Sequence, residues 1–306
     1  MSRSELAMYF TRIAAQSEDS LALAGHLYAY EDEKITRVMR LSGGEWSHLG
    51  DLPEIVGSAT SLGPRSSDRE IAMMLRNGVV HWWRGTEHDV EIIDESRGLF
   101  FAEIRAIGSE ILACGTGRQV FQRGSSGWFA RDDGLVCGPT NPSRILTSVD
   151  GPSSSELLAV GTGGDVFHFD GRGWRELDSP TDFGLTRVLY VDGTWYVGGF
   201  HGLLMRGDPD GFEILTEEEG TPMITDLAWF RGGLWIATEF DLSRLEGSER
   251  ERVDVPVEGE IGFGSLASIG NSLWSVGGES VLRLNGTSGS WDAFGFPWNG
   301  RTSAEE

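Results

Sequence analysis

The sequence lacks several features that define common classes of protein. Its 306 residues include only two cysteines, Cys114 and Cys137, too few for a disulfide framework in a chain of this length. No stretch approaches the ~20 apolar residues of a membrane-spanning helix. The amino-terminal segment also has no apolar run of signal-peptide length. We therefore expect a cytoplasmic protein.

Basic residues are scarce as well. There are 25 basic and 47 acidic residues, which gives a net charge of −22, and Lys34 is the single lysine. Such a charge repels phosphates and argues against binding to nucleic acid or to anionic membranes. Two explanations stay open: the charge serves solubility alone, or it speeds encounter with a basic protein partner.

Proline is also infrequent, with 10 residues, whereas glycine is abundant, with 43. Glycine enrichment without proline enrichment indicates many tight turns rather than a low-complexity linker. Apolar residues make up 39% and aromatic residues 10% of the chain, enough to build a substantial core. The chain length fits one large β domain or two ordinary domains.

One apolar run recurs seven times at intervals of about 42 residues. Each copy follows a strand-like stretch that ends in a turn, and each precedes an alternating strand and a second turn. In five copies an aromatic residue then opens a fourth strand. The seven runs are "LALAGHL" at Leu21, "IAMMLRNG" at Ile71, "ILACGTGR" at Ile111, "LLAVGTGG" at Leu157, "WYVGGFHG" at Trp195, "LWIATEFD" at Leu234 and "LWSVGGES" at Leu273.

Four short strands per unit, joined by hairpin turns, predict an all-β fold, a seven-bladed β-propeller of four-stranded antiparallel blades. We expect one domain, with a short tail at 297–306. The expected blades span approximately 8–50, 56–95, 99–133, 144–178, 184–217, 223–256 and 262–296. Blade seven is complete on this count, so the ends of the ring should meet by packing, although an exchanged strand remains an alternative.

The "GTGG" of the fourth run, at 161–164, could suggest a phosphate-binding loop. Such a loop needs a following helix and a Lys-Ser or Lys-Thr pair. Here Gly164 is followed by the strand-like "DVFHF". We therefore interpret this stretch as a turn between two strands.

Blades four and six carry a resemblance to known repeats. "AVGTGGDVFHFDGRGWREL" resembles the bacterial propeller repeat with the pattern VG-x-GG-x-I-x-H-x-DG-x-x-W, and "LWIATEFDLSRLEG" is similar to blades of periplasmic sensor propellers. The resemblance implies the seven-bladed fold. It leaves the function open, because propellers include enzymes, lectins and protein scaffolds.

In a propeller, one face collects the loops between second and third strands and the segments that join blades. This face is usually the one that binds partners or ligands. Acidic residues dominate these loops, and we expect the contacts with a partner there. The candidate contact residues are Arg76, Asn77, Arg118, Asp165, Phe200, His201, Glu217, Glu218, Glu239, Phe240, Asp241 and Glu279.

Enzymatic and metal-binding roles are weaker alternatives on the same face. His201 and Glu239 are the best pair for proton abstraction. Oxygen ligands for a hard cation could come from Asp165, Glu239, Asp241 and Glu279. No segment has the spacing of a calcium loop and no nucleophile motif is present, so we predict no catalytic residue, no metal site and no cofactor.

Tryptophan could stack on sugars, which makes a sugar-binding propeller a further alternative. Four of the eleven tryptophans recur at the start of the fourth strand, so they should be structural: Trp46, Trp128, Trp174 and Trp291. Trp82, Trp83, Trp229 and Trp298 lie outside that pattern, and core packing is the favoured role for each.

The sequence thus predicts a non-enzymatic, protein-binding propeller that is monomeric in isolation. A basic partner fits the charge, and one concrete version is an immunity protein that neutralises a nuclease-type toxin. A metal-assisted lyase or hydrolase that uses the central funnel is the main alternative.

Overall fold

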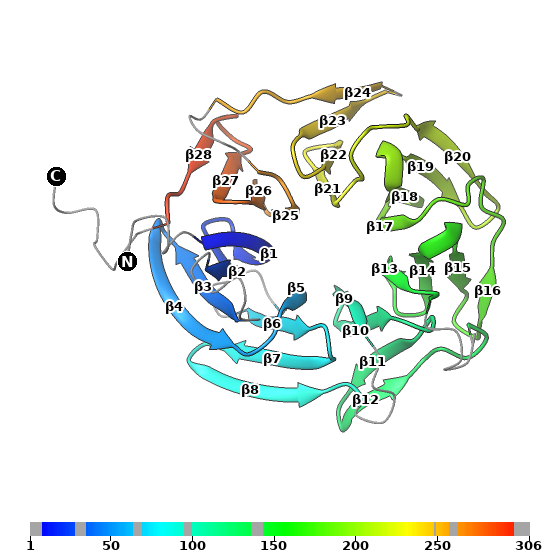
Figure 1. Cartoon of the computed structure of the whole chain (residues 1–306), viewed down its shortest axis with the longest axis horizontal. Coiled ribbons are helices and arrows are strands. Elements are labelled where there is room, and N and C mark those ends of the chain that lie inside the picture. Colours follow the sequence, from blue (N-terminus) through cyan, green and yellow to red (C-terminus); the bar gives the residue numbers. More distant parts are fainter. Residues whose placement is uncertain are drawn as a thin grey trace, which may run out of the picture.

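Seven antiparallel sheets of four strands stand around a central axis as the blades of a wheel (Figure 1). The computed structural model describes residues 8–27, 35–63, 69–94, 100–135, 143–247, 249–256 and 262–296. The predicted seven-bladed propeller is confirmed. Lys34, Cys137, Trp298 and the predicted tail 297–306 lie outside the described residues. No helix in the described ranges is long and apolar enough to span a membrane.

The first two strands of each blade lie closest to the axis. The innermost strands are β1 (Met8–Ser17), β5 (Val56–Leu62), β9 (Phe101–Ile107), β13 (Leu146–Ser153), β17 (Leu185–Val191), β21 (Asp226–Phe230) and β25 (Ser265–Ile269). The second strands are β2 (Ser20–Leu27), β6 (Glu70–Leu75), β10 (Glu110–Gly115), β14 (Glu156–Gly161), β18 (Thr194–Gly199), β22 (Gly233–Ala237) and β26 (Ser272–Gly277). These second strands are the seven recurrent apolar runs, and nearly all their residues are buried because a blade packs on each side.

The last two strands of each blade form the outer part of the wheel. The third strands are β3 (Thr36–Ser42), β7 (Val79–Arg84), β11 (Val120–Gly124), β15 (Val166–Phe169), β19 (Leu204–Asp208), β23 (Leu242–Glu246) and β27 (Ser280–Asn285). The fourth strands, largely exposed, are β4 (Glu45–Leu52), β8 (Glu87–Ile92), β12 (Gly127–Ala130), β16 (Trp174–Glu176), β20 (Gly211–Thr216), β24 (Glu249–Arg252) and β28 (Trp291–Ala293).

The "GTGG" stretch is a turn, as predicted. Thr162–Gly164 form a short 3-10 turn between β14 and β15, and Gly164 has a left-handed backbone with φ +75°. A Cβ atom at Gly164 would lie 2.1 Å from the carbonyl oxygen of Thr181, in the segment that leads to blade five. Glycine is therefore required here by a close backbone approach.

The core is divided among the interfaces between blades. Buried apolar side chains of the described residues form seven clusters, and each cluster lies between two neighbouring blades. Trp82 and Trp83 show how one strand supplies two clusters: Trp82 packs toward blade three and Trp83 toward blade one. Both are less than 5% exposed, which confirms the expected core packing.

A ring of polar side chains around the axis joins every blade to the next. One residue of each innermost strand contributes, and each forms a hydrogen bond to the following blade. The residues of this polar ring are Arg12, Ser58, Glu103, Ser148, Arg187, Asp226 and Ser265. Their partners, in the same order, are Gly57 O, Ile104 O, Val149 N, Val188 N, Asp226 Oδ1, Leu266 N and Thr11 O, at 2.6 to 3.4 Å.

Backbone irregularities direct these side chains. In blades one to five, a β-bulge at the residue before the ring position interrupts the pairing of the first and second strands. A bulge re-aims the side chain that follows it. Ser148, for example, is fully buried and accepts a hydrogen bond from the amide of Val188 at 3.1 Å. The polar ring therefore satisfies backbone groups that the sheets leave unpaired.

The wheel closes without exchange of a strand, as expected, but its ends meet through hydrogen bonds and not by packing alone. Each sheet contains four strands that are consecutive in the sequence, and Phe10 N donates a hydrogen bond to Gly278 O at 2.7 Å across the seam. The segment after β28 then crosses to blade one. Trp46 Nε1 donates to Gly295 O at 2.9 Å, and the Trp46 and Phe296 rings pack edge to face.

Two other recurrent tryptophans make the same outer contact with the preceding blade. Trp128 Nε1 donates to the Glu91 carboxylate at 3.1 Å, and Trp174 Nε1 donates to Arg131 O at 2.7 Å. Trp291 packs against Trp235 of blade six. The tryptophans that open the fourth strands are thus engaged in joining blades.

We predict that Ser148→Ala lowers the free energy of unfolding by about 1–3 kcal/mol, because the buried Val188 amide loses its acceptor. Denaturant unfolding followed by tryptophan fluorescence measures this. Ser126→Ala, in an exposed turn, is the matched control and should change the stability by less than about 0.5 kcal/mol. Equal stabilities of the two variants would contradict the role given to the polar ring.

A second prediction concerns the stacked His81 and His88 rings, whose Nδ1 and Nε2 atoms lie 3.1 Å apart. Burial, and then the neighbouring His88, lower the pKa of His81 to about 4. In the unfolded chain a histidine titrates near pH ~6.5. The folded state resists this protonation, so its stability should be full above that pH and decline as the pH falls toward 4.

The melting temperature of the wild type should therefore fall more steeply between about pH 6.5 and 5 than that of His81→Phe, which has no proton to gain. Thermal unfolding curves at closely spaced pH values provide the comparison. Parallel pH profiles for the two proteins would show that His81 does not contribute.

Candidate functional site

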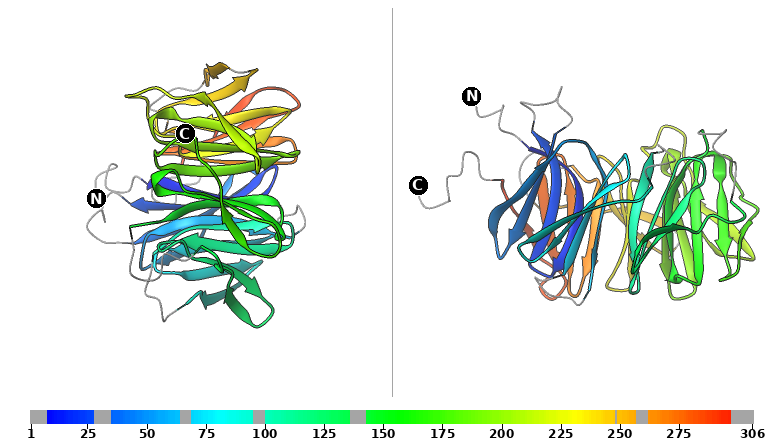
Figure 2. Two further views of the ribbon diagram at one scale, coloured as in Figure 1. Left: turned by 90° about the vertical axis from the view of Figure 1, so that its right-hand side faces the viewer. Right: turned by 90° about the horizontal axis from the view of Figure 1, so that it is seen from below.

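The loops between second and third strands and the segments that join blades lie on one face of the disc, which we call the upper face. Figure 2 shows the disc edge-on. All twelve candidate contact residues belong to these loops and segments: Arg76, Asn77, Arg118, Asp165, Phe200, His201, Glu217, Glu218, Glu239, Phe240, Asp241 and Glu279. The structure divides them into exposed residues and residues that other side chains already engage.

Arg118 and Asp165 are bound to one another. Arg118 donates two hydrogen bonds of 2.8 Å to the Asp165 carboxylate, and Arg144 donates a third at 3.0 Å. Asp165 is only 4% exposed, and the Arg118 guanidinium also lies over the Phe167 ring. This cluster fixes the loops of blades three and four to each other, and we leave its members out of the contact surface.

The remaining candidates are exposed or half-buried, and their carboxylates lie on the loops and joining segments of blades five to seven. Asp241 has an exposed partner, Arg252, at 3.0 Å. The exposed acidic residues are Glu217, Glu218, Glu239 and Glu279, together with Glu219 of the same joining segment. Arg76 and Asn77 are exposed as well.

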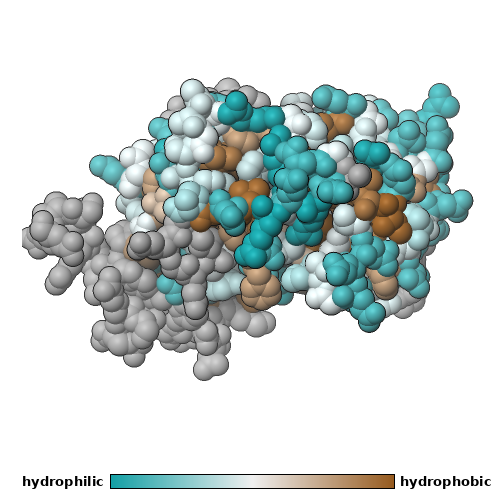
Figure 3. Space-filling model, turned by 90° about the horizontal axis from the view of Figure 1, so that it is seen from above, coloured by the Kyte–Doolittle hydropathy of each residue, from teal (hydrophilic) through white to brown (hydrophobic). Residues whose placement is uncertain are grey.

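Large apolar side chains are exposed among these charges. Phe240 is 61% exposed and Phe200 46%, on the loops of blades six and five. Three more lie where blades begin or are joined: Tyr9, Phe100 and Met223, each more than a third exposed. The other large apolar residues that are exposed in the described ranges lie on fourth strands: Val90 and Ile92 on β8, Phe129 on β12 and Ile214 on β20. Figure 3 shows a side of the wheel with small hydrophobic patches among hydrophilic residues.

Tyr9, Phe100 and Met223 also line a cavity of about 410 Å³ at the mouth of the central channel, which we call the upper chamber. Phe263 and Ile224 contribute to its mainly apolar wall. Glu239 lies on this wall, and the Arg76 guanidinium is 5.3 Å from the centroid of the Phe100 ring.

Two members of the polar ring, Arg12 and Arg187, lie at the floor of the upper chamber. Arg12 and Arg187 line both this chamber and a second cavity of about 600 Å³ on the opposite side of the ring, the lower chamber. The lower chamber is more polar and contains Glu103, Arg105 and Asp226. The channel therefore has two compartments of different chemistry.

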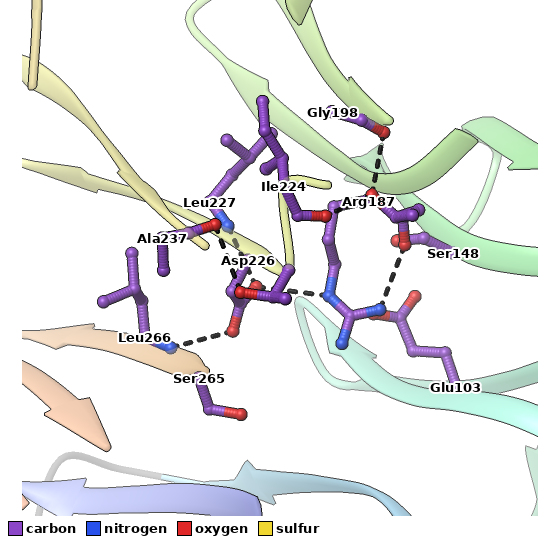
Figure 4. Close-up of polar contacts among 12 residues, drawn as sticks. Glu103, Ser148, Arg187, Gly198, Ile224, Asp226, Leu227, Ala237, Ser265 and Leu266 are labelled. Carbon is purple, nitrogen blue, oxygen red and sulfur yellow. Dashed lines mark hydrogen bonds and ion pairs between the residues drawn. The ribbon is translucent and has the colours of Figure 1, made fainter. Parts of the chain in front are cut away.

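The polar ring contains two arginines and two acidic residues, but only one arginine, Arg187, forms an ion pair with an acidic residue of the ring. In Figure 4 the Arg187 side chain extends toward Asp226, whose Oδ1 lies 3.3 Å from Arg187 Nε. Burial raises the pKa of Glu103. Arg105, whose Nη1 lies 3.5 Å from Glu103 Oε1, acts in the opposite direction but does not outweigh burial. Among the described residues, Arg12 donates to two carbonyl oxygens, those of Gly57 and Thr11. Its pKa is lowered to about 10, first by burial and then by Arg187.

The residues considered for catalysis or metal binding lie in different surroundings. Asp165 is held by Arg118 and Arg144, and the His201 ring packs on Phe183 with centroids 4.8 Å apart. Glu239 faces the upper chamber. In the described ranges, no group of three or more His, Cys, Asp or Glu residues is placed to hold a metal ion.

The sequence contained a signal for the polar ring that we did not use. Each innermost strand has one polar residue at the same position, and successive members are 46, 45, 45, 39, 39 and 39 residues apart. Tyr9, Phe100 and Met223 were also missed. Tyr9 is the second residue of β1, and Phe100 and Met223 shortly precede β9 and β21. An apolar residue at such a position looks like an ordinary part of the strand.

No protein-family model matches the chain. Therefore the bacterial repeat family suggested by blades four and six stays a prediction. The chain is 29% identical over 187 residues to "Immune protein Tsi7" of Pseudomonas aeruginosa, an alignment that covers 60% of this chain and 61% of the relative. The matched region thus spans less than two thirds of that protein.

Solved propellers share the fold at low sequence identity. The WD40 β-propeller domain of Doa1 superposes with a TM-score of 0.68 at 8% identity, over 90% of this chain and 92% of that one. Sqt1 of Saccharomyces cerevisiae gives a TM-score of 0.61 at 12% identity, over 99% and 92%. A chain of the mitotic checkpoint complex gives 0.66 at 12%, over 94% and 86%.

We predict that Asp165→Asn destabilises the protein by about 3 kcal/mol, because the largely buried Arg118 and the half-buried Arg144 both lose their anion. Asp241→Asn is the control, since its ion pair with Arg252 is exposed, and should cost less than about 1 kcal/mol. Chemical unfolding of both variants makes the comparison. A stable Asp165→Asn protein would return Asp165 to the list of available contact residues.

Proposed function

We propose that this chain is a non-enzymatic immunity protein that binds a protein toxin through its upper face and thereby inhibits it. The observation that carries the proposal is that this face exposes several large apolar side chains, three of them around the mouth of the channel, and carries carboxylates on the loops of blades five to seven. The similarity to a protein named as an immune protein supports this role.

Apolar side chains exposed in a group favour a protein partner. A soluble protein rarely exposes a contiguous apolar patch without function. Phe240, Phe200 and Met223 would supply buried contact area, and truncation of such central residues typically costs the most binding energy. The surrounding carboxylates of Glu217, Glu218 and Glu239 would attract a basic partner and orient it.

A rigid scaffold suits an inhibitor of this kind. The loops of the upper face are anchored by the blades beneath them, so little conformational entropy is lost when they bind. The basic character of the partner, the monomeric state and the cytoplasmic location are part of the proposal. They follow the net charge of −22 and the expectations drawn from the sequence.

The test uses the product of the gene adjacent to the one that encodes this chain, expressed in a bacterial host with and without the chain. Growth should be arrested by the toxin alone and restored by co-expression. Purified components should bind in calorimetry, and affinity should fall as salt rises, because exposed charges are screened. Affinity that is independent of salt would contradict electrostatic attraction.

We predict that Phe240→Asp and Met223→Asp each weaken toxin binding at least about tenfold, because each places an unpaired charge in the contact. Ile92→Asp is the matched control. It introduces the same charge at an apolar residue whose exposure, 46%, is close to the 44% of Met223 and below the 61% of Phe240, but which lies on β8 at the rim. Loss of protection with the control as well would mean that the upper face is not the contact surface.

A further inference from the structure

The upper chamber combines an apolar wall with a cationic floor. Phe100, Met223 and Phe263 line the wall, and the Arg12 and Arg187 guanidinium groups lie at the polar ring below. The volume of about 410 Å³ falls in the range of small-molecule sites. The described residues that line the chamber leave it open on the upper face.

Arg12 can form an ion pair with a ligand anion, whereas Arg187 already has a carboxylate partner. Arg187 pairs with Asp226, whereas within the described residues no carboxylate lies at ion-pair distance from Arg12. The Arg12 hydrogen bonds go to two carbonyl oxygens, which carry no net charge. Asp226 and Glu103 attract Arg12 from beyond ion-pair distance, but neither is paired with it directly. A buried cation without a directly paired anion is costly, and a ligand anion would offset that cost.

We infer that the upper chamber binds an apolar group that ends in a single carboxylate, with the carboxylate on Arg12 and the apolar body against Phe100 and Met223. Glu239 on the wall disfavours a second negative charge. The lower chamber does not share this preference, because Asp226 and Glu103 lie there beside the arginines. The inference stands independently of the proposed immunity function.

Two sources could supply this chemistry: a free amphipathic carboxylate, or the carboxyl terminus of a polypeptide with an apolar last residue. The experiment titrates the full chain with 4-phenylbutyrate and with 4-phenylbutyramide in calorimetry. The acid should bind at least about tenfold more tightly than the amide, because a charge-assisted hydrogen bond contributes more than a neutral one.

A pentapeptide that ends in phenylalanine, with a free or an amidated terminus, forms the second arm. Tighter binding of the free acid in either arm supports the inference and identifies the source. Equal binding of acid and amide in both arms, or no binding of any probe at about 10 mM, overturns it. Neither result bears on toxin neutralisation, which is measured separately.

Arg12→Gln should reduce affinity for the acid to that for the amide, while Arg206→Gln, on β19 of the outer part of blade five, should change neither. Since Arg12 belongs to the polar ring, circular dichroism must first show that the variant is folded. Met223→Asp provides a second route. Its added negative charge on the chamber wall should weaken binding of the acid at least about tenfold and change the affinity for the amide by no more than about twofold.

Discussion

Hydrogen bonds from one blade to the next around the axis are the constraint on which the rest of this structure depends. The seven apolar clusters hold neighbouring blades together, but apolar contact is not directional. The polar ring supplies direction, because each of its seven side chains meets a defined group of the following blade. It thus sets the height at which blades meet, and it divides the channel into two chambers.

The two layers of the molecule have separate tasks. Near the axis, Ser148, Glu103 and Asp226 satisfy backbone amides and fix the scaffold. On the upper face, Phe240, Met223 and the acidic residues of the joining segments are exposed. A rigid base under variable loops is the usual arrangement of a binding protein. The chemistry of recognition can therefore change without a change in the ring.

The fold could be predicted because it is repeated seven times, so an error in one blade is corrected by the others. Trp82 and Trp83 were assigned to the core because aromatic side chains are usually buried. Adjacent residues of a strand face opposite sides, which is why the two rings pack on different blades. The Arg118–Asp165 pair was not foreseen as a pair. Its members are 47 residues apart, and only the stacking of successive blades brings equivalent loops into contact. The upper chamber was missed for a related reason, since Tyr9, Phe100 and Met223 come from three different blades.

The seam of this wheel has an evolutionary consequence. Because every sheet is built from four strands that are contiguous in the gene, duplication or deletion of one segment of about 40 codons adds or removes a whole blade without cutting any sheet. A propeller that closes with a borrowed strand must instead preserve both ends together. Lineages of this protein can therefore acquire new surfaces by copying entire blades and letting the copies diverge.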